Sequence, residues 1–131
     1  MQPLPLVSLI VLLAILEFMV LGFMVGRARG KYGIKAPATS GNEMFERHFR
    51  EHYNTLEQLI VFLPAVWLFG SYISDLWGAI LGAVFILGRV LFAVGYVRDP
   101  AKREVGALLS AAGVIPLVLG ALYGVIRQLI A

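Results

Sequence analysis

The sequence contains no cysteine, and this absence excludes a disulfide framework, a thiolate metal site and a catalytic cysteine. Any thiol in its chemistry must therefore come from a ligand. Glycine-rich phosphate loops, His-x-x-His pairs and zinc-type spacings are also missing, so the sequence motifs of nucleotide and metal sites do not apply. Charged residues make up only 15% of the 131 residues, so what remains is an apolar chain with few charges.

Hydrophobic residues account for 60% of the chain, against roughly 45–50% in ordinary soluble domains. The mean hydropathy of +0.84 agrees with this excess, and together they predict an integral membrane protein. The formal net charge is only +3. Most lysines and arginines fall in two clusters beside apolar segments, a distribution that argues against a nucleic-acid partner.

Four long apolar segments predict an all-α, four-helix bundle that forms a single domain over residues 1–131. The helices are expected at about residues 4–26, 43–70, 76–97 and 103–128. The first is about 20 residues long, enough to cross a ~30 Å hydrocarbon core. It lacks a basic amino-terminal region and is longer than a typical signal-peptide core, so we expect a retained helix. The glycines, proline and charges of residues 27–42 predict a loop, and residues 71–75 and 98–102 predict short turns.

Basic residues are distributed unevenly among the loops. The first loop carries four of them and the third carries Arg98, Lys102 and Arg103, whereas the N-terminus and second loop have none. The positive-inside rule therefore predicts that loops one and three are cytoplasmic and that both termini face outward. The short loops fit a multi-pass protein of a bacterial inner membrane.

A charged stripe leads into the second helix. Arg47, Arg50, Asn54 and Glu57 are spaced i, i+3, i+7 and i+10, which puts their side chains on one helix face. The apolar part of this helix, residues 59–69, spans only about 16 Å, so Asn54 and Glu57 should lie at membrane depth. A charge facing lipid there costs about 2.5–3.5 kcal/mol, so the stripe should face protein or a wet cavity. Since four helices enclose little interior, we expect it to lie between subunits.

Two further ionisable residues interrupt apolar helices, namely Glu17 in the first and Arg89 in the third. Each needs a polar partner, either the other residue or another polar group, and we expect both to be structural. His48 and His52 lack companions for a metal site and are expected to face solvent or headgroups. Three pairs of glycines have GxxxG spacing, which allows close helix packing within a chain or between chains: 22/26, 78/82 and 120/124.

The pattern Phe45-Glu46-Arg47, followed by Arg50, Asn54 and Glu57, resembles the MAPEG family, membrane-associated proteins in eicosanoid and glutathione metabolism. The resemblance is strengthened by Arg89, Gly95-Tyr96 and Arg103, and it covers nearly the whole chain. Within the family, the chain is similar to microsomal glutathione transferases. The resemblance implies a homotrimer that binds glutathione between neighbouring subunits near the cytoplasmic side. The glutathione thiolate would attack a lipophilic electrophile or a lipid hydroperoxide.

The resemblance also assigns roles to individual residues. Arg50, Asn54 and Glu57 match the glutathione contacts of the second helix, and Arg29 matches an arginine that ends the first. Arg103 matches the arginine that stabilises the thiolate, and Tyr96 matches a tyrosine of the third helix. For Tyr96, contact with the thiolate and an ordinary interfacial position are equally open.

Three positions depart from the eicosanoid-producing branch of that family. Gln58 stands where a tyrosine often follows the glutamate, Phe92 where a tyrosine or histidine can occur, and Glu104 where prostaglandin E synthases have a serine. These departures favour a general glutathione transferase or peroxidase over a specific eicosanoid synthase.

The residue chemistry suits glutathione, which carries a net charge of about −1 as a thiol and −2 as a thiolate. A cluster of Arg29, Arg47, Arg50 and Arg103 can pair with its carboxylates, and Glu57 can pair with its ammonium. A thiol with a pKa of about 8.5 is only a few per cent ionised at pH 7. One guanidinium about 4 Å away offers at most ~4 kcal/mol, equivalent to about 3 pKa units before desolvation opposes it.

Other interpretations remain at this stage. Arg47, Arg50 and Glu57 can form an ion-pair network that binds nothing, and Arg29 and Arg103 can serve topology and headgroup contact. A non-catalytic lipid-binding scaffold of the same fold is one alternative function. A small proton-coupled drug exporter that uses Glu17 is another, although the long charged start of the second helix fits it poorly.

Overall fold

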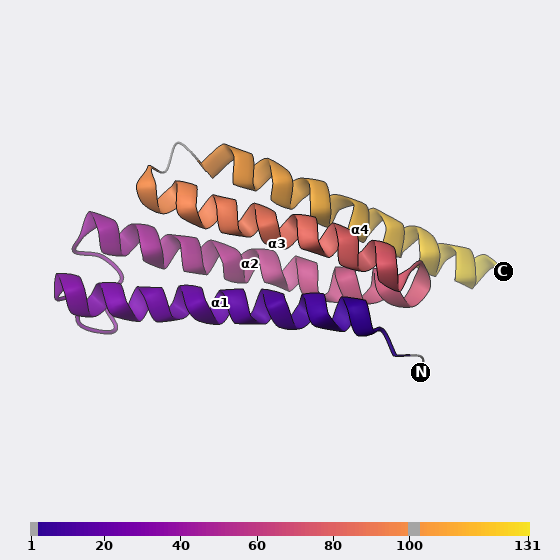
Figure 1. Ribbon diagram of the computed structural model, residues 1–131, viewed down its shortest axis with the longest axis horizontal. Helices are drawn as coiled ribbons and strands as arrows, with labels where there is room; N and C mark the ends of the chain where they lie inside the picture. Colours follow the sequence, from indigo (N-terminus) through magenta and orange to yellow (C-terminus); the bar gives the residue numbers. More distant parts are fainter. Residues whose placement is uncertain (1–2, 100–102) are drawn as a thin grey trace.

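The computed structural model describes residues 3–99 and 103–131, and all regular structure in these ranges is helical. The helices are α1 (Pro5–Tyr32), α2 (Glu43–Tyr72), α3 (Asp75–Arg98) and α4 (Glu104–Ile130). They run up and down, so that both chain ends lie at one end of the bundle and the α1–α2 loop lies at the other (Figure 1). The predicted all-α four-helix fold is confirmed. Lys102, which belongs to the predicted third loop, lies outside the described residues.

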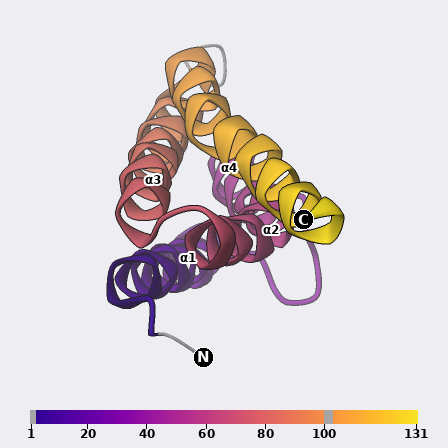
Figure 2. The same ribbon diagram turned by 90° about the vertical axis from the view of Figure 1, so that its right-hand side faces the viewer.

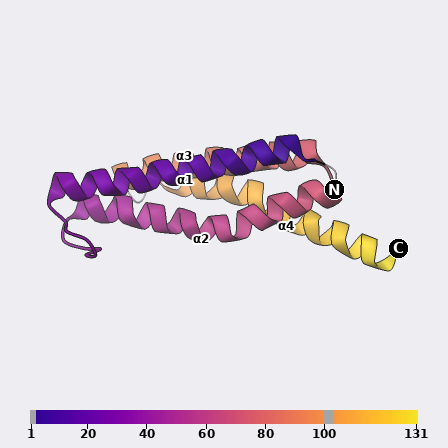
Figure 3. The ribbon, with the colours of Figure 1, turned by 90° about the horizontal axis from the view of Figure 1, so that it is seen from below.

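Helix α2 is central to the bundle because it packs against each of the other three helices. Helices α3 and α4 form a close pair on one side, and α1 packs on α2 and α3 on the other (Figure 2). Towards its C-terminal end α4 diverges from the rest of the bundle (Figure 3). This arrangement leaves two faces of α2 for cavities, one beside α4 and one beside α1.

The main core is a cluster of buried apolar side chains from all four helices. At its centre Phe62 and Phe85 stack with ring centroids 4.0 Å apart. Leu117 from α4 and Val7 from α1 are fully buried against it. A smaller cluster joins the start of α2 to the end of α1 and consists of Phe45, Val25 and Ala28.

The end of α1 differs from the prediction. The helix continues six residues past the expected end at position 26 and includes Arg27, Arg29 and Gly30. It ends at Tyr32 and is capped by Gly33, whose φ of 68° is left-handed and easily adopted only by glycine. An isolated glycine such as Gly30 weakens a helix without ending it. The predicted end at residue 26 relied on the local glycine and charge content and was therefore too early. The other observed helix ends lie within two residues of the predicted ones.

Side-chain caps fix the starts of α2 and α3. Asn42 accepts a hydrogen bond from the backbone of Phe45, and Ser74 accepts one from Trp77. Asp75 in the first turn of α3 accepts hydrogen bonds from the N–H groups of Leu6 and Val7, at 3.1 and 2.9 Å. The start of α1 is thereby tied to the start of α3.

The outer surface of the bundle is apolar. Large side chains such as Phe23, Leu108 and Leu129 are 73%, 72% and 79% exposed. All four helices are long and apolar enough to cross a bilayer. An apolar surface of this extent is typical of a protein surrounded by lipid.

Candidate functional site

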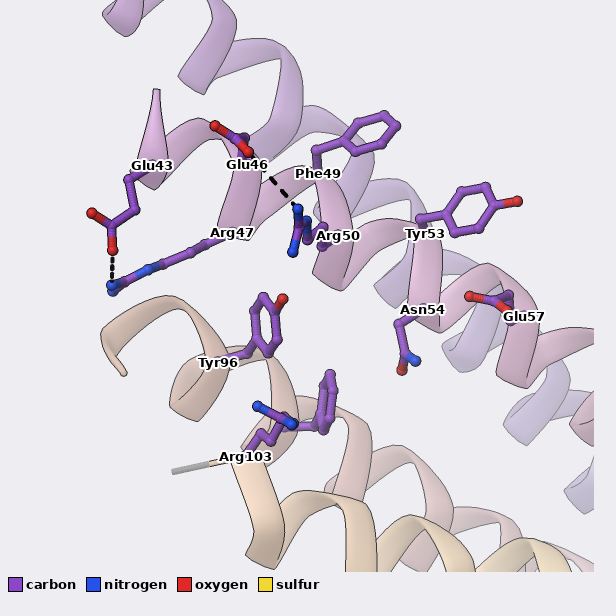
Figure 4. Close-up of a pocket in the computed structure, with 11 residues that line it drawn as sticks. Glu43, Glu46, Arg47, Phe49, Arg50, Tyr53, Asn54, Glu57, Tyr96 and Arg103 are labelled. Atoms are coloured by element: carbon purple, nitrogen blue, oxygen red, sulfur yellow. Dashed lines mark hydrogen bonds and ion pairs between the residues drawn. The ribbon is translucent and has the colours of Figure 1, made fainter. Parts of the chain in front are cut away.

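A cavity of about 690 Å³ opens between α2, α3 and the start of α4. Its upper wall in Figure 4 is the charged stripe of α2, and its lower wall comes from α3 and α4. Eleven residues line it: Glu43, Glu46, Arg47, Phe49, Arg50, Tyr53, Asn54, Glu57, Phe92, Tyr96 and Arg103.

Six of the seven residues predicted for the site line this cavity. The seventh, Arg29, is in the last turns of α1 and points elsewhere. Its guanidinium donates to the carbonyl of Ala38 at 2.7 Å and lies 4.8 Å from the centroid of the Phe45 ring. Within a single chain, Arg29 is therefore separate from the other six.

Two arginines of the cavity already have partners within the chain. Arg47 pairs with Glu43 and donates to the carbonyl oxygens of Val97 and Arg98, both at 3.1 Å. It fastens the start of α2 to the end of α3. Arg50 lies 3.9 Å from Glu46 and its side chain is 69% exposed, so this weak pair leaves it available to a ligand.

A buried polar network supports the floor of the cavity. Arg89 is only 3% exposed and donates at 2.8 Å to both Asn54 Oδ1 and Thr55 Oγ1. Thr55 in turn donates to Glu51 at 2.9 Å, and the Glu51 carboxylate is 3.9 Å from Arg89. The sequence left two kinds of partner open for Arg89, namely Glu17 or another polar group. In the structure its hydrogen-bond partners are polar groups of α2. Arg89 and Asn54, predicted as separate features, belong to one network.

Aromatic rings position the α4 end of the site. Phe92 and Tyr96 stack with centroids 5.7 Å apart, and the Arg103 guanidinium lies 5.9 Å from the Tyr96 centroid. Arg103 directly precedes the first residue of α4 and therefore lies at the positive end of that helix dipole. The Arg89 guanidinium stacks on the other ring of this aromatic pair, 4.3 Å from the centroid of Phe92.

The sequence interpretation missed several lining residues. Glu43, Glu46, Phe49 and Tyr53 all occupy the same stretch of α2. The helical spacing that selected Arg47 and Arg50 also places Glu43, Glu46 and Tyr53 beside them, so the signal was present. Phe92 was noted only as a departure from a family pattern, although it forms part of the wall.

Both histidines, which the sequence predicts to face solvent or headgroups, are half-buried. His52 is half-buried and its ring stacks on Phe18 with centroids 4.3 Å apart. His48 is also half-buried and lines a separate cavity between α1, α2 and α3. Packing of α1 against α2 covers both rings, which the pattern of α2 alone does not reveal.

Comparison with known proteins gives the class of this fold and site. The MAPEG family model matches residues 7–123, so the chain belongs to the MAPEG family and is an integral membrane protein. The predicted family resemblance is confirmed.

Three relatives illustrate the range of similarity. Uncharacterized protein sll1147 of Synechocystis is 52% identical over 122 residues, covering 93% of this chain and 89% of the relative. Human microsomal glutathione S-transferase 2 is 40% identical over 100 residues, covering 75% and 67%. Guinea-pig (Cavia porcellus) leukotriene C4 synthase is 30% identical over 114 residues, covering 87% and 75%.

Proposed function

We propose that the protein is a membrane glutathione transferase that joins glutathione to lipophilic electrophiles or reduces lipid hydroperoxides with it. The supporting observation is the cavity that gathers Arg47, Arg50, Asn54, Glu57, Tyr96 and Arg103. Two named relatives, a microsomal glutathione S-transferase and a leukotriene C4 synthase, fit the same assignment. No metal takes part in the proposed reaction.

The charges of the cavity favour a site shared between subunits of a homotrimer. Three arginines and three glutamates line the cavity of one chain, so their formal charges cancel. Glutathione has a net charge of about −1 as a thiol, which a neutral site matches poorly. If Arg29 of a neighbouring subunit closes the cavity, the site gains one positive charge and becomes complementary to the ligand. In this arrangement Arg29, which lies outside the cavity of its own chain, contributes to the cavity of the neighbouring subunit.

Within this site each polar side chain matches one part of glutathione. Arg50 and Arg29 pair with carboxylates, and Glu57 pairs with the ammonium group. Asn54 donates to the peptide portion of the ligand. Arg47 contributes positive charge while it holds α2 against α3 through its carbonyl contacts.

Arg103 and Tyr96 are the proposed catalytic residues. The guanidinium and the N-terminal dipole of α4 both favour the thiolate over the thiol, and the Tyr96 hydroxyl can donate to the same sulfur. In conjugation the thiol proton passes to water, the sulfur–carbon bond forms, and the leaving group departs with its electron pair. With a hydroperoxide the thiolate attacks oxygen and releases an alcohol, and a second glutathione converts the sulfenic acid to a disulfide and water.

The electrophile approaches from the bilayer. The exposed apolar surface of the helices lets a lipophilic compound reach the cavity laterally, whereas glutathione enters from water. By the positive-inside rule this aqueous side is the cytoplasm, which holds loops one and three.

Equilibrium binding of glutathione to the purified protein tests the proposal. Wild type should bind saturably, and Arg50→Ala and Glu57→Ala should each weaken binding about tenfold or more because each loses a charge-assisted contact. Arg127→Ala, far from the cavity in the last turn of α4, is the matched control. Undetectable binding by folded wild type would reject the proposal.

A turnover assay then separates an enzyme from a lipid-binding scaffold. With chlorodinitrobenzene or a lipid hydroperoxide, the enzyme should show glutathione-dependent turnover that Arg103→Ala strongly reduces. A protein that binds glutathione but turns over neither compound would fit the scaffold instead.

A further inference from the structure

A second cavity lies on the other side of α2, between α1, α2 and α3, and shares no residue with the proposed glutathione site. Its volume is about 500 Å³, within the range of about 300–1,000 Å³ that is typical of ligand pockets. Most of its wall is aliphatic, from Val20, Leu21, Val90 and Val94. The size and the wall suit a lipophilic ligand.

One polar group in this cavity lacks a partner. Glu17 lines it from α1, and its Oε1 atom is buried and accepts no hydrogen bond from any described residue. Glu17 lies 12 residues from the start of α1, about 18 Å along the helix and far from either end. An ionisable group at such a depth is costly unless it serves a ligand or a partner.

The neighbouring charges do not supply that partner. Glu51 also lines the cavity, but its carboxylate accepts from Thr55 and faces Arg89 at 3.9 Å. Arg89 divides its hydrogen bonds between Asn54 and Thr55. Arg89 forms its ion pair with Glu51 and none with Glu17, so the formal charges of these three residues leave one negative charge in excess.

Two further charged or titratable residues line the cavity, His48 and Arg98, and neither donates a hydrogen bond to Oε1 of Glu17. His48 is one turn before Glu51 on α2, and Arg98 is eight residues beyond Val90 on α3, about 12 Å along the helix. Val20 and Val94 are 57% and 46% exposed, so a ligand can enter sideways between α1 and α3 from the lipid.

We propose that this second cavity binds a lipophilic amine whose ammonium group pairs with Glu17. An ammonium supplies both the donor that Oε1 lacks and the charge that Arg89 does not balance. The alkyl part of the ligand lies along the aliphatic wall. The proposal concerns a separate site and does not depend on glutathione binding.

Binding of n-decylammonium to the full-length protein in nanodiscs of neutral lipid tests this assignment. Decanol and decyl sulfate, with the same chain and different head groups, serve as comparison probes. Glu17→Gln keeps the shape of the side chain and removes the charge. The matched control is Glu104→Gln, which makes the same change at an exposed position in the first turn of α4, outside both cavities.

The expected result is saturable decylammonium binding that Glu17→Gln weakens about tenfold or more and Glu104→Gln leaves unchanged. Decanol should bind more weakly and decyl sulfate least. Equal binding by wild type and Glu17→Gln, equal binding of decanol and decylammonium, or no saturable binding would each overturn the assignment. Thermal unfolding of each variant verifies that it is folded. Glutathione affinity, measured on the same samples, reports separately on the first site and should not change in Glu17→Gln.

Discussion

At the scale of single residues, the orientation of Asn54 is informative. Arg89 can only donate hydrogen bonds, so the Asn54 atom that faces it must be the oxygen. The amide nitrogen of Asn54 is then left for the cavity. Asn54 should therefore act towards a ligand as a donor, and Arg89 positions it without lining the cavity itself.

Changing Asn54 to Asp tests this donor role. The new carboxylate still accepts from Arg89 but has no N–H to offer, and its charge repels an anionic ligand. We expect a loss of about 1–3 kcal/mol in glutathione binding, equivalent to roughly a five- to 150-fold higher Kd by titration calorimetry. Gln58→Glu makes the same amide-to-acid change on α2 outside the cavity and should have little effect. An unchanged Kd in Asn54→Asp would show that Asn54 does not donate to the ligand.

The buried Arg89–Glu51 pair should matter for stability. Arg89→Met leaves Glu51, which is 2% exposed, without a cation, and breaking a buried pair in this way costs about 3–5 kcal/mol. The double variant Arg89→Met/Glu51→Gln removes the stranded charge and should recover part of that loss. Thermal unfolding in detergent measures both, and a double variant no more stable than the single one would contradict the explanation.

Residue-scale prediction from sequence succeeded where helical periodicity was sufficient. Helical spacing placed four residues on one face of α2, and all four line one cavity in the structure: Arg47, Arg50, Asn54 and Glu57. Periodicity could not show that Arg89, 35 positions away from Asn54, bonds to it. That contact depends on how α3 is rotated against α2, which only three-dimensional packing determines.

At the scale of helices, glycines set the distance between α3 and α4. A Cβ added at Gly106 would overlap the backbone of Phe92, and one at Gly88 would overlap the backbone of Ser110. The GxxxG pairs seen in the sequence are not the residues of this closest approach. Gly78, Gly82 and Gly120 instead meet side chains of the same chain, such as Phe69. Spacing identified glycine-rich helices but not which glycines touch backbone.

Replacing Gly106 with Ala should therefore force α3 and α4 apart. We expect destabilisation on the order of 1–3 kcal/mol, as for other overpacked sites, and lower turnover because Arg103 and Tyr96 lie on the separated helices. Gly30→Ala is the control, since its added Cβ would meet no atom of the described chain within 4 Å. The two measurements are the thermal midpoint and glutathione-dependent turnover. A Gly106→Ala protein as stable as wild type would refute the packing argument.

At the scale of the whole molecule, the seven residues predicted for the site do not all meet within one chain. Six of its residues share a cavity, whereas Arg29 bonds to Ala38 elsewhere on the surface. The sequence predicted a membrane bundle and the contents of one cavity wall. The homotrimer that the family resemblance implies stays a prediction, because an apolar helix surface suits lipid as well as a neighbouring subunit.

Mixed oligomers test whether subunits share the site. Homo-oligomers of Arg29→Ala and of Arg50→Ala should both bind glutathione weakly. Oligomers that contain both variants should regain some wild-type sites, formed by Arg50 of one subunit and Arg29 of its neighbour. Doubly tagged mixed oligomers, purified and titrated with glutathione, give the measurement. If no high-affinity sites reappear, Arg29 does not act across the interface.

The length of α1 has a further consequence. Its 28 residues extend about 42 Å, some 12 Å more than the ~30 Å thickness of a bilayer core. Because the surplus is rigid helix, the height and direction of Arg29 follow the tilt of the whole rod, and tilt responds to hydrophobic mismatch. If neighbouring subunits share the proposed glutathione site, lipid chain length would set how well they close around the tripeptide, and membrane thickness would tune its binding.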